Sequence, residues 1–522
     1  MRFSKAAPTL LAAVALLFAG AAKASVKVDG GLVSAAREDG LSVYRGIPYA
    51  AAPVGDLRWR APEPVRPWRG VMHATAFAPA CLQTGVSMPG ETPPVTSEDC
   101  LHLNVWTPAK ASGARLPVMV FIHGGGFSNG SAAMPLYSGE RLARRGVIVV
   151  SFGYRLGPMG YLALPELTRE SPDHASGDYG LLDQIAALKW VRRNIAAFGG
   201  DPWRVTVFGQ SAGAMSISLL MASPLAKGLF QGAIGESGGV FEPLQLAPDW
   251  RLPGAEKEGH AYAASLGAAS LAELRRLPAA RLLQGKAGSI THPVIENYAL
   301  TASPYEVFAA GRQNDVPILV GSNEEEARSL ADLSTVKAAS FDADITRAWG
   351  ALPPVLFAGY PHTTDAEAKT ARVGFERDLR FGWDMWTWAR LQATTGKQPV
   401  YYYHFTQQPP FPGGSVYAGW GASHYAELWY VFDHLDQDPW AWTAGDRGLA
   451  EAMATYWTNF AKSGDPNGAS VPQWPRFAGA DGRVLYLGSP ITTGGVADLT
   501  TLKVFDAVYA QVRGAPVPAG RP

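Results

Sequence analysis

The sequence predicts an α/β protein built on a central, mainly parallel β-sheet that is covered by helices on both faces. Several continuous apolar runs are each followed by a helical pattern, and such runs are typical of strands buried on both faces of a parallel sheet. These candidate strands span residues 116–125, 147–155, 204–210, 316–322 and 399–405. Two helical patterns that lie between these runs support the same class.

The first helical pattern covers residues 179–200 and leads directly into the candidate strand at 204–210. Gly199 and Gly200 are expected to end it. Its apolar side chains fall close to one face: Leu181, Ile185, Leu188 and Ile195. The second pattern covers residues 378–393 and carries an apolar stripe, for which core packing is expected. The stripe consists of Phe381, Met385, Trp388 and Leu391.

Residues 1–24 are typical of an export signal. Arg2 and Lys5 precede an apolar stretch, and Ala22-Lys23-Ala24 forms a small-x-small cleavage site. The apolar stretch is shorter than the ~20 residues that a membrane span needs, and no later segment is long and apolar enough. Removal of the signal takes away three basic residues and no acid, which leaves 42 basic against 45 acidic residues. This balance gives no electrostatic sign of nucleic acid or anionic lipid as a partner.

The rest of the chain is expected to form one large domain over residues 25–513. A length of 522 residues would by itself suggest about three domains. However, no internal repeat, low-complexity linker or shift in composition divides the sequence. The Pro/Gly-rich end at residues 514–522 is expected to be a disordered tail.

Cys81 and Cys100 are the two cysteines of the sequence. In an exported chain, a single disulfide between them is the natural pairing. It would close a loop of about twenty residues, for which the chain-entropy estimate is ~3 kcal/mol of stabilisation. Two independent thiols stay open as the alternative.

Two serines have the same glycine-flanked pattern, G-x-S-x-G. Ser211 lies in "GQSAG" at residues 209–213, and Ser237 lies in "GESGG" at residues 235–239. A nucleophilic serine of this kind needs a strand, a tight turn and a helix in that order. A strand pattern precedes Ser211 and a run of small, helix-compatible residues follows it, whereas no helix pattern follows Ser237. We therefore predict Ser211 as the nucleophile and place Ser237 near the same site, at the end of the next strand.

An oxyanion on the substrate needs fixed hydrogen-bond donors, and two segments supply them. The motif "HGGG" at residues 123–126 follows a candidate strand, and its bare glycines let backbone amides approach one oxygen. The N–H of Ala212, at the start of the predicted helix, is a further donor. The same glycines form neither a P-loop, which needs a following lysine, nor a dinucleotide motif, which needs G-x-G-x-x-G spacing.

The serine also needs a base to take its proton and an acid to orient that base, in the chain order serine, acid, histidine. Three candidates for the acid follow the strand at 316–322, and their spacing does not choose among them: Glu324, Glu325 and Glu326. The downstream histidines, for each of which a structural role stays open, are His362, His404, His424 and His434. His424 lies in a Gly/Trp-rich loop that suits a mobile base, whereas His404 falls inside a candidate strand.

Longer motifs give the chain a resemblance to a known family. They include "YRGIPYAAAPVGDLRWRAPEPV", "SEDCLHLNVWTP", "FIHGGGF", "GYRLGPMGYL", "SHYAELWYVF" and the block "YGLLDQIAALKWVRRNIAAFGGDPWRVTVFGQSAGAMS". On these motifs the chain resembles the type-B carboxylesterases, which include bacterial p-nitrobenzyl esterases and the cholinesterases. The resemblance covers nearly all of the chain after the predicted signal.

The resemblance implies the α/β-hydrolase fold, with a central, mostly parallel sheet flanked by helices and with large helical and loop insertions. It implies Ser211 as nucleophile, His424 as base and Glu326 as acid, because "SNEEEA" aligns with the family pattern N-x-D-E-G, whose last acid is catalytic. It also implies an oxyanion hole formed by Gly125, Gly126 and Ala212. Ser237 matches a serine that lies close to the triad in the family, and Cys81 and Cys100 match a disulfide.

Two departures from the family pattern bear on function. Ala327 replaces the usual glycine after the acid, and the loop from Cys81 to Cys100 contains no aromatic residue. Cholinesterases bind choline through a tryptophan in that loop, so capture of a quaternary ammonium by cation–π contact loses its main ring. A general carboxylesterase is therefore favoured over a cholinesterase. Three aromatic residues near the base are candidates for a pocket wall or for plain packing: Trp420, Tyr425 and Trp429.

The expected function is that of an exported serine carboxylesterase, periplasmic or extracellular, which cleaves small-molecule esters through an acyl-enzyme. No metal is expected, because His424 and Glu427 lack further ligands at a recognisable spacing, and the chemistry needs no organic cofactor. An amidase, an esterase specialised for one natural ester and a non-catalytic binding protein on the same fold stay open.

Overall fold

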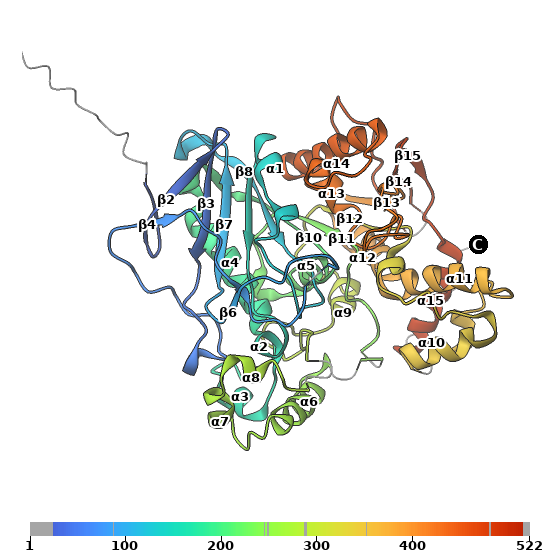
Figure 1. The fold of residues 1–522 in the computed structure, drawn as a ribbon, viewed down its shortest axis with the longest axis horizontal. Coiled ribbons are helices and arrows are strands. Elements are labelled where there is room, and N and C mark those ends of the chain that lie inside the picture. Colours follow the sequence, from blue (N-terminus) through green and yellow to red (C-terminus); the bar gives the residue numbers. More distant parts are fainter. Residues whose placement is uncertain are drawn as a thin grey trace, which may run out of the picture.

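The computed structural model describes residues 25–514, apart from residues 87, 245, 248, 249, 287–289, 351, 480 and 481. The predicted export signal at residues 1–24 and residues 515–522 of the predicted tail lie outside the described residues. Figure 1 shows how the described elements are arranged along the chain.

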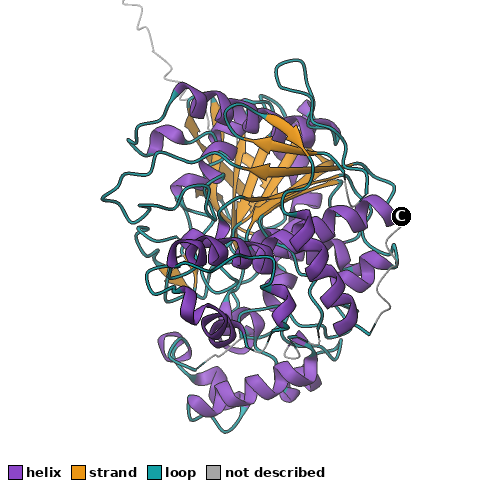
Figure 2. Cartoon of the chain, turned by 90° about the vertical axis from the view of Figure 1, so that its right-hand side faces the viewer, coloured by secondary structure: helices purple, strands orange, loops and turns teal. Residues whose placement is uncertain are grey.

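A single large sheet forms the centre of the molecule, and Figure 2 shows it as one twisted layer with helices around it. Within the described residues it has 13 strands, in the order β1-β2-β3-β7-β9-β8-β10-β11-β12-β13-β14-β15, with β4 paired to β2. The strands are β1 (Ser25–Val28), β2 (Gly31–Glu38), β3 (Leu41–Pro48), β4 (Val71–Ala74), β7 (His102–Thr107), β8 (Leu116–Ile122), β9 (Ile148–Phe152), β10 (Gly200–Gln210), β11 (Gly232–Glu236), β12 (Ile318–Asn323), β13 (Val400–Phe405), β14 (Val484–Leu487) and β15 (Thr492–Gly494). A separate pair consists of β5 (Ala80–Cys81) and β6 (Thr96–Ser97).

The middle of the sheet is parallel and its ends are antiparallel. Every neighbouring pair from β9 through β14 is parallel, whereas the pairs β1–β2, β2–β3, β3–β7, β7–β9 and β14–β15 are antiparallel. All five strands that the sequence predicts are present, and they are β8, β9, β10, β12 and β13. The mainly parallel sheet is therefore confirmed.

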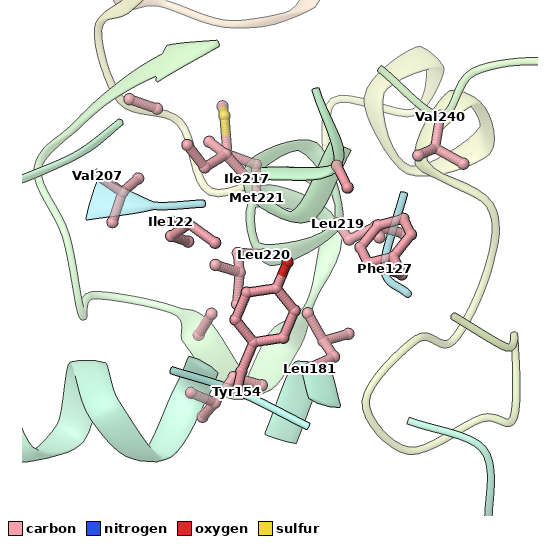
Figure 3. Close-up of a cluster of buried hydrophobic side chains, with 14 of the residues drawn as sticks. Ile122, Phe127, Tyr154, Leu181, Val207, Ile217, Leu219, Leu220, Met221 and Val240 are labelled. Atoms are coloured by element: carbon pink, nitrogen blue, oxygen red, sulfur yellow. The ribbon is translucent and has the colours of Figure 1, made fainter. Parts of the chain in front are cut away.

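Alternate side chains of the central strands enter two separate hydrophobic cores, one on each face of the sheet. In β8, Val118, Val120 and Ile122 belong to the first core, whereas Met119 and Phe121 belong to the second. This period of two explains why the strand is apolar throughout, since neither of its faces meets water. Figure 3 shows part of the first core, where Ile122 and Val207 face the side chains of α5 (Ala212–Ala222).

Helices cover both faces and also form two insertions. In addition to α5 they are α1 (Glu140–Arg144), α2 (Gly157–Tyr161), α3 (Pro165–Glu170), α4 (Tyr179–Asn194), α6 (Leu252–Ser265), α7 (Leu271–Arg276), α8 (Ala279–Leu282), α9 (Pro304–Ala309), α10 (Phe341–Trp349), α11 (Asp365–Arg377), α12 (Trp383–Thr395), α13 (Leu428–Val431), α14 (Ala444–Ser463) and α15 (Leu499–Val512). The insertion between β11 and β12 contains α6, α7 and α8, which gather away from the sheet in Figure 1. The insertion between β12 and β13 contains α10, α11 and α12.

Two further sequence predictions can be compared with the structure. Cys81 and Cys100 form the expected disulfide, at a sequence separation of 19 residues. None of the helices within the described residues is long and apolar enough to cross a membrane.

Candidate active site

Ser211 occupies a strained turn between a strand and a helix. β10 ends at Gln210 and α5 begins at Ala212, so Ser211 is the single residue between them. Its φ of 57° and ψ of −127° lie in a region that residues with a side chain rarely adopt. The flanking glycines allow this turn to press against β8, because a Cβ at Gly213 would lie 2.0 Å from the carbonyl oxygen of Ile122, and one at Gly209 would lie 2.6 Å from the same oxygen. The turn has the geometry of a nucleophile elbow.

Ser237 occupies a second strained turn next to the first. It follows β11 directly with a φ of 53°, and its backbone N–H donates to the carbonyl oxygen of Gly321 at 2.8 Å. The two turns touch, because a Cβ at Gly238 would lie 2.3 Å from the carbonyl oxygen of Ser211. The Ser237 hydroxyl is buried and has no hydrogen-bond partner among the described residues. The structure therefore brings both serines together but leads only Ser211 into a helix.

His424 and Glu326 form a buried hydrogen-bonded pair. Nδ1 of the imidazole lies 2.6 Å from Oε2 of the carboxylate, and the side chains of both residues are almost fully buried. The other oxygen, Oε1, accepts a hydrogen bond from the backbone N–H of Asn323 at 2.7 Å. The backbone N–H of His424 donates to the carbonyl oxygen of Glu326 at 3.2 Å. The carboxylate is thus fixed at both oxygens, and it fixes the orientation of the imidazole in turn.

The two neighbouring glutamates make different contacts. Oε2 of Glu325 accepts a hydrogen bond from the backbone N–H of Ala422 at 3.1 Å, and Arg328 donates to Oε1 of Glu325 at 2.6 Å. Glu325 therefore ties down the loop that carries His424. Glu324 is exposed, and partial burial of its carboxyl together with the charge of Glu325 raises its pKa. Among the three acids, Glu326 is the one whose carboxylate bonds to the imidazole.

The other candidate histidines lie in different surroundings. His404 is buried within β13, and burial lowers its pKa to about 3. Nδ1 of His434 lies 3.0 Å from the carbonyl oxygen of Leu136, and His362 is partly exposed with Nε2 3.5 Å from Asp342. Among the described residues, none of these three imidazoles forms a hydrogen bond with Glu324, Glu325 or Glu326.

The glycine motif after β8 lies against the serine turn. Gly125 and Gly126 have positive φ angles of 111° and 60°, and a Cβ at Gly124 would lie 3.0 Å from the Cβ of Ser211. Phe127, which follows the glycines, is buried in the same core as Leu219 of α5 (Figure 3). Ala212 is the first residue of α5, so its N–H lies at the positive end of the helix dipole. Gly124 therefore lies against Ser211 and Ala212 follows it directly, whereas the oxyanion role of Gly125, Gly126 and Ala212 stays a prediction.

Three contacts to His424 were missed by sequence reasoning. Phe381 stacks on the imidazole with ring centroids 4.5 Å apart and planes 13° apart, and Tyr425 contacts it edge-on at 4.5 Å. The side-chain nitrogen of Gln210 lies 3.2 Å from Nε2 and 3.4 Å from Nδ1. Phe381 sits in a π-helical segment, Asp378–Gly382, just before α12. Its spacing matched a core stripe, so the stacking contact left no separate signal in the sequence.

Two further carboxyl groups are buried below the triad candidates. Burial raises the pKa of Glu236 to about 8, although Trp457 donates a hydrogen bond to its Oε1 at 2.7 Å. Burial and then the charges of Glu326 and Glu236 raise the pKa of Glu427 well above its usual range, and Asn323 donates to its Oε2 at 2.5 Å. At neutral pH both groups therefore favour the neutral acid. No group of three or more His, Cys, Asp or Glu side chains that could hold a metal ion is present within the described residues.

Comparison with known proteins identifies the family. Residues 22–501 match the Carboxylesterase family. Fumonisin B1 esterase of Sphingopyxis macrogoltabida is 37% identical over 88% of this chain and 85% of its own length, and para-nitrobenzyl esterase of Bacillus subtilis (strain 168) is 35% identical over 90% and 95%. A solved structure of a PNB esterase is 34% identical and superimposes with a TM-score of 0.79, covering 92% of this chain and all of that one.

The fold is thus the α/β-hydrolase fold, as the resemblance implied. The chain belongs to the carboxylesterase family and is a carboxylic ester hydrolase.

Proposed function

We propose that the protein is an exported serine carboxylesterase in which Ser211, His424 and Glu326 form the catalytic triad within one domain over residues 25–513. The observation that carries this proposal is the 2.6 Å hydrogen bond between His424 Nδ1 and Glu326 Oε2, at a site where Ser211 occupies a strained turn before a helix. A serine hydroxyl is a weak nucleophile unless a base takes its proton and a third group orients that base.

In the proposed reaction, Nε2 of His424 takes the proton of Ser211 as its oxygen attacks the ester carbonyl. The bond from serine to carbon forms, and the resulting oxyanion accepts hydrogen bonds from the backbone N–H groups of Gly125, Gly126 and Ala212. The imidazolium then gives its proton to the leaving alcohol, and the carbon–oxygen bond of the ester breaks. A water molecule, deprotonated by the same imidazole, then attacks the acyl carbon. The bond from this carbon to the Ser211 oxygen breaks, the imidazolium returns its proton to that oxygen, and the acid leaves.

One contact in the structure must change during this cycle. Nε2 of His424, the proposed proton acceptor, lies 3.2 Å from the side-chain nitrogen of Gln210. The Ser211 hydroxyl has to replace this amide as the partner of Nε2 before the proton can move. Catalytic hydrogen bonds often tighten only when substrate is bound, so such a rearrangement fits a resting enzyme.

Small-molecule esters are the proposed substrates. The names of two relatives, Fumonisin B1 esterase and para-nitrobenzyl esterase, support this class. Export rests on residues 2–24 of the sequence and agrees with the Cys81–Cys100 disulfide, because disulfides persist in oxidising compartments. Expression of the full chain in a bacterium with an intact export pathway tests this part. The recovered protein should have the mass of a chain that begins at Ser25, and an uncleaved cytoplasmic product would contradict export.

The catalytic proposal is tested by comparing wild type, Ser211→Ala and Ser237→Ala on p-nitrophenyl acetate and on the matching anilide. Loss of the nucleophile should lower kcat by about 10³-fold or more in Ser211→Ala, with a much smaller loss in Ser237→Ala. Circular dichroism of both variants controls for folding. Undiminished ester hydrolysis in Ser211→Ala would contradict the proposal, and activity on the anilide alone would make the protein an amidase.

A further inference from the structure

The glycine motif that carries the proposed oxyanion hole is followed by a tight turn that packs back on the motif. The backbone N–H groups of Ser128 and Asn129 both donate to the carbonyl oxygen of Gly125, at 3.1 and 3.0 Å. A Cβ at Gly125 would lie 2.2 Å from the carbonyl oxygen of Asn129. A Cβ at Gly130 would lie 2.5 Å from the carbonyl oxygen of Gly124. The position of the motif therefore depends on where the end of this turn is held.

Gln83, in the loop between Cys81 and Cys100, holds the end of the turn. The backbone N–H of Gly130 donates to Oε1 of Gln83 at 2.8 Å, and Nε2 of Gln83 donates to the carbonyl oxygen of Gly130 at 2.8 Å. The same Nε2 donates to the carbonyl oxygen of Cys81 at 3.0 Å. One buried side-chain amide thus satisfies both backbone groups of Gly130 and joins them to a cysteine of the disulfide.

A second contact joins the same two segments in a different way. The backbone N–H of Gly85 donates to Oδ1 of Asn129 at 3.1 Å. Gln83 therefore bonds to the backbone of the turn, whereas Gly85 bonds to a side chain that can rotate about its own torsions. We expect the backbone of the turn to depend more on Gln83 than on the contact with Gly85.

We propose that Gln83 is a positioning residue: through Gly130 it holds the glycine motif where the backbone N–H groups of the motif stabilise the oxyanion. The proposal rests on the proposed function, because it assumes an oxyanion hole at Gly125 and Gly126. Among the described residues, the hydrogen bonds of the Gln83 side chain go to Gly130 and Cys81, so it acts on the motif and not on the triad. The loop closed by the disulfide thereby takes part in catalysis.

The test compares Gln83→Met with Gln313→Met. Methionine has nearly the length of glutamine and lacks both of its hydrogen-bonding groups. Gln313 is the matched control, because it is also buried and its Nε2 donates to side chains at the end of α12, those of Gln392 and Thr395. In Gln83→Met, kcat for p-nitrophenyl acetate should fall by about 10²-fold, as for a misplacement of about 1 Å in an active site. In Gln313→Met it should stay near that of wild type.

Two readouts separate positioning from a general loss of active enzyme. Because the oxyanion exists only in the transition state, kcat and kcat/KM should fall by the same factor. A trifluoromethyl ketone forms a tetrahedral adduct that resembles this state, so its Ki should rise by about 10²-fold as well. Titration with diethyl p-nitrophenyl phosphate counts the competent sites, and all rates are expressed per site. A role in packing alone would reduce the number of sites and leave kcat per site and Ki unchanged.

Two further variants sharpen the assignment. Gln83→Asn keeps the amide but draws it back by one methylene, so it should reproduce the loss even if Gln83→Met folds poorly. Asn129→Ala removes the contact with Gly85 and should cause a smaller loss than either Gln83 variant. Thermal unfolding of every variant controls for folding.

The outcomes separate this inference from the proposed function. Rates per site near those of wild type in both Gln83 variants, a lower kcat with an unchanged Ki, or a greater loss in Asn129→Ala would overturn the role of Gln83. Failure of the proposed function would show instead as ester hydrolysis that persists in Ser211→Ala, whatever the result at Gln83.

Discussion

The two turns "GQSAG" and "GESGG" share a sequence pattern and much of their geometry, yet they differ in what surrounds them. Ser211 and Ser237 both follow parallel strands that pair with each other, both are buried, and both have a positive φ, 57° and 53°. Only Ser211 precedes a helix, and its side chain lies close enough to the hydroxyl of Tyr425 to lower the pKa of that group, which burial raises, while the Tyr425 ring contacts the imidazole of His424 edge-on. Backbone strain therefore marks the site as a whole, whereas the helix and the neighbouring side chains distinguish the proposed nucleophile.

The largest expected effect comes from changing Glu326, whose carboxylate bonds to the imidazole of His424. Glu326→Gln keeps the shape of the side chain but no longer stabilises the imidazolium or its tautomer, so kcat should fall by about 10³–10⁴-fold. Glu324→Gln and Glu325→Gln are matched controls, measured with the same ester. Glu325→Gln should show a smaller loss through the His424 loop. A greater loss in either control than in Glu326→Gln would reassign the acid.

The glycines of the two turns differ in what they touch. A Cβ at Gly213 would meet the backbone oxygen of Ile122 at 2.0 Å, whereas a Cβ at Gly239 would meet the side chain of Asp384 at 2.9 Å. A side chain can move aside more easily than a strand, so Gly213→Ala should lower the free energy of unfolding by about 1–3 kcal/mol more than Gly239→Ala. Urea denaturation measures both. An equal decrease in the free energy of unfolding for both variants would show that contact with β8 does not constrain the turn at Ser211.

The residues before the two serines differ in whether they can ionise. Glu236 has its pKa raised by burial to about 8 from an ordinary value of 4.5, so the folded protein keeps a proton that the unfolded chain has lost. As pH rises between these two pKa values, the unfolded state is therefore stabilised relative to the folded state. The free energy of unfolding falls by up to about 1.4 kcal/mol per pH unit. In Glu236→Gln, the decrease in the free energy of unfolding between about pH 6 and pH 7 should be smaller by up to about 1.4 kcal/mol than in wild type. Parallel pH dependence in both proteins would show that Glu236 does not retain its proton.

Gln210, the corresponding residue of the other turn, lies 3.2 Å from Nε2 of His424 as a neutral amide. Gln210→Glu would add a negative charge to a site where Glu326 is already bonded to the imidazole and where Glu427 and Glu236 are buried close by. A carboxylate beside Nε2 would attract the imidazolium, so the acid limb of the kcat/KM profile should move up by about one pH unit. Gln210→Met, which is uncharged, is the control. Identical acid limbs in the two variants would mean that the amide does not influence the base.

Much of the fold could be predicted because the central strands are buried on both faces and leave continuous apolar runs. The strands at the antiparallel end were not predicted, since β2 and β4 contain exposed positions and shorter apolar runs. Trp420, Tyr425 and Trp429 were suggested as pocket walls or as plain packing. In the structure Trp429 lines a cavity of about 740 Å³, Tyr425 contacts the imidazole of His424, and Trp420 packs on Phe411 and Tyr417.

The site was only partly predictable. The order of motifs along the chain indicated the serine and the glycine loop. Loop position favoured His424 among the histidines, whereas only the family resemblance selected Glu326 among the three glutamates. The contacts of Phe381 and Gln210 with the imidazole join segments that are far apart in sequence, and Phe381 lies in a π-helical turn. Tyr425 is adjacent to His424, and its contact goes with a left-handed backbone, φ 75°. No local pattern encodes such contacts.

Covalent trapping of the nucleophile tests the central claim most directly. Diethyl p-nitrophenyl phosphate transfers its phosphoryl group to an activated serine and releases one p-nitrophenol for each serine modified. Peptide mass spectrometry of the inactivated enzyme should find one diethylphosphoryl group on Ser211 and none on Ser237, in proportion to the activity lost. An adduct on Ser237, or inactivation without an adduct on Ser211, would contradict the proposed nucleophile.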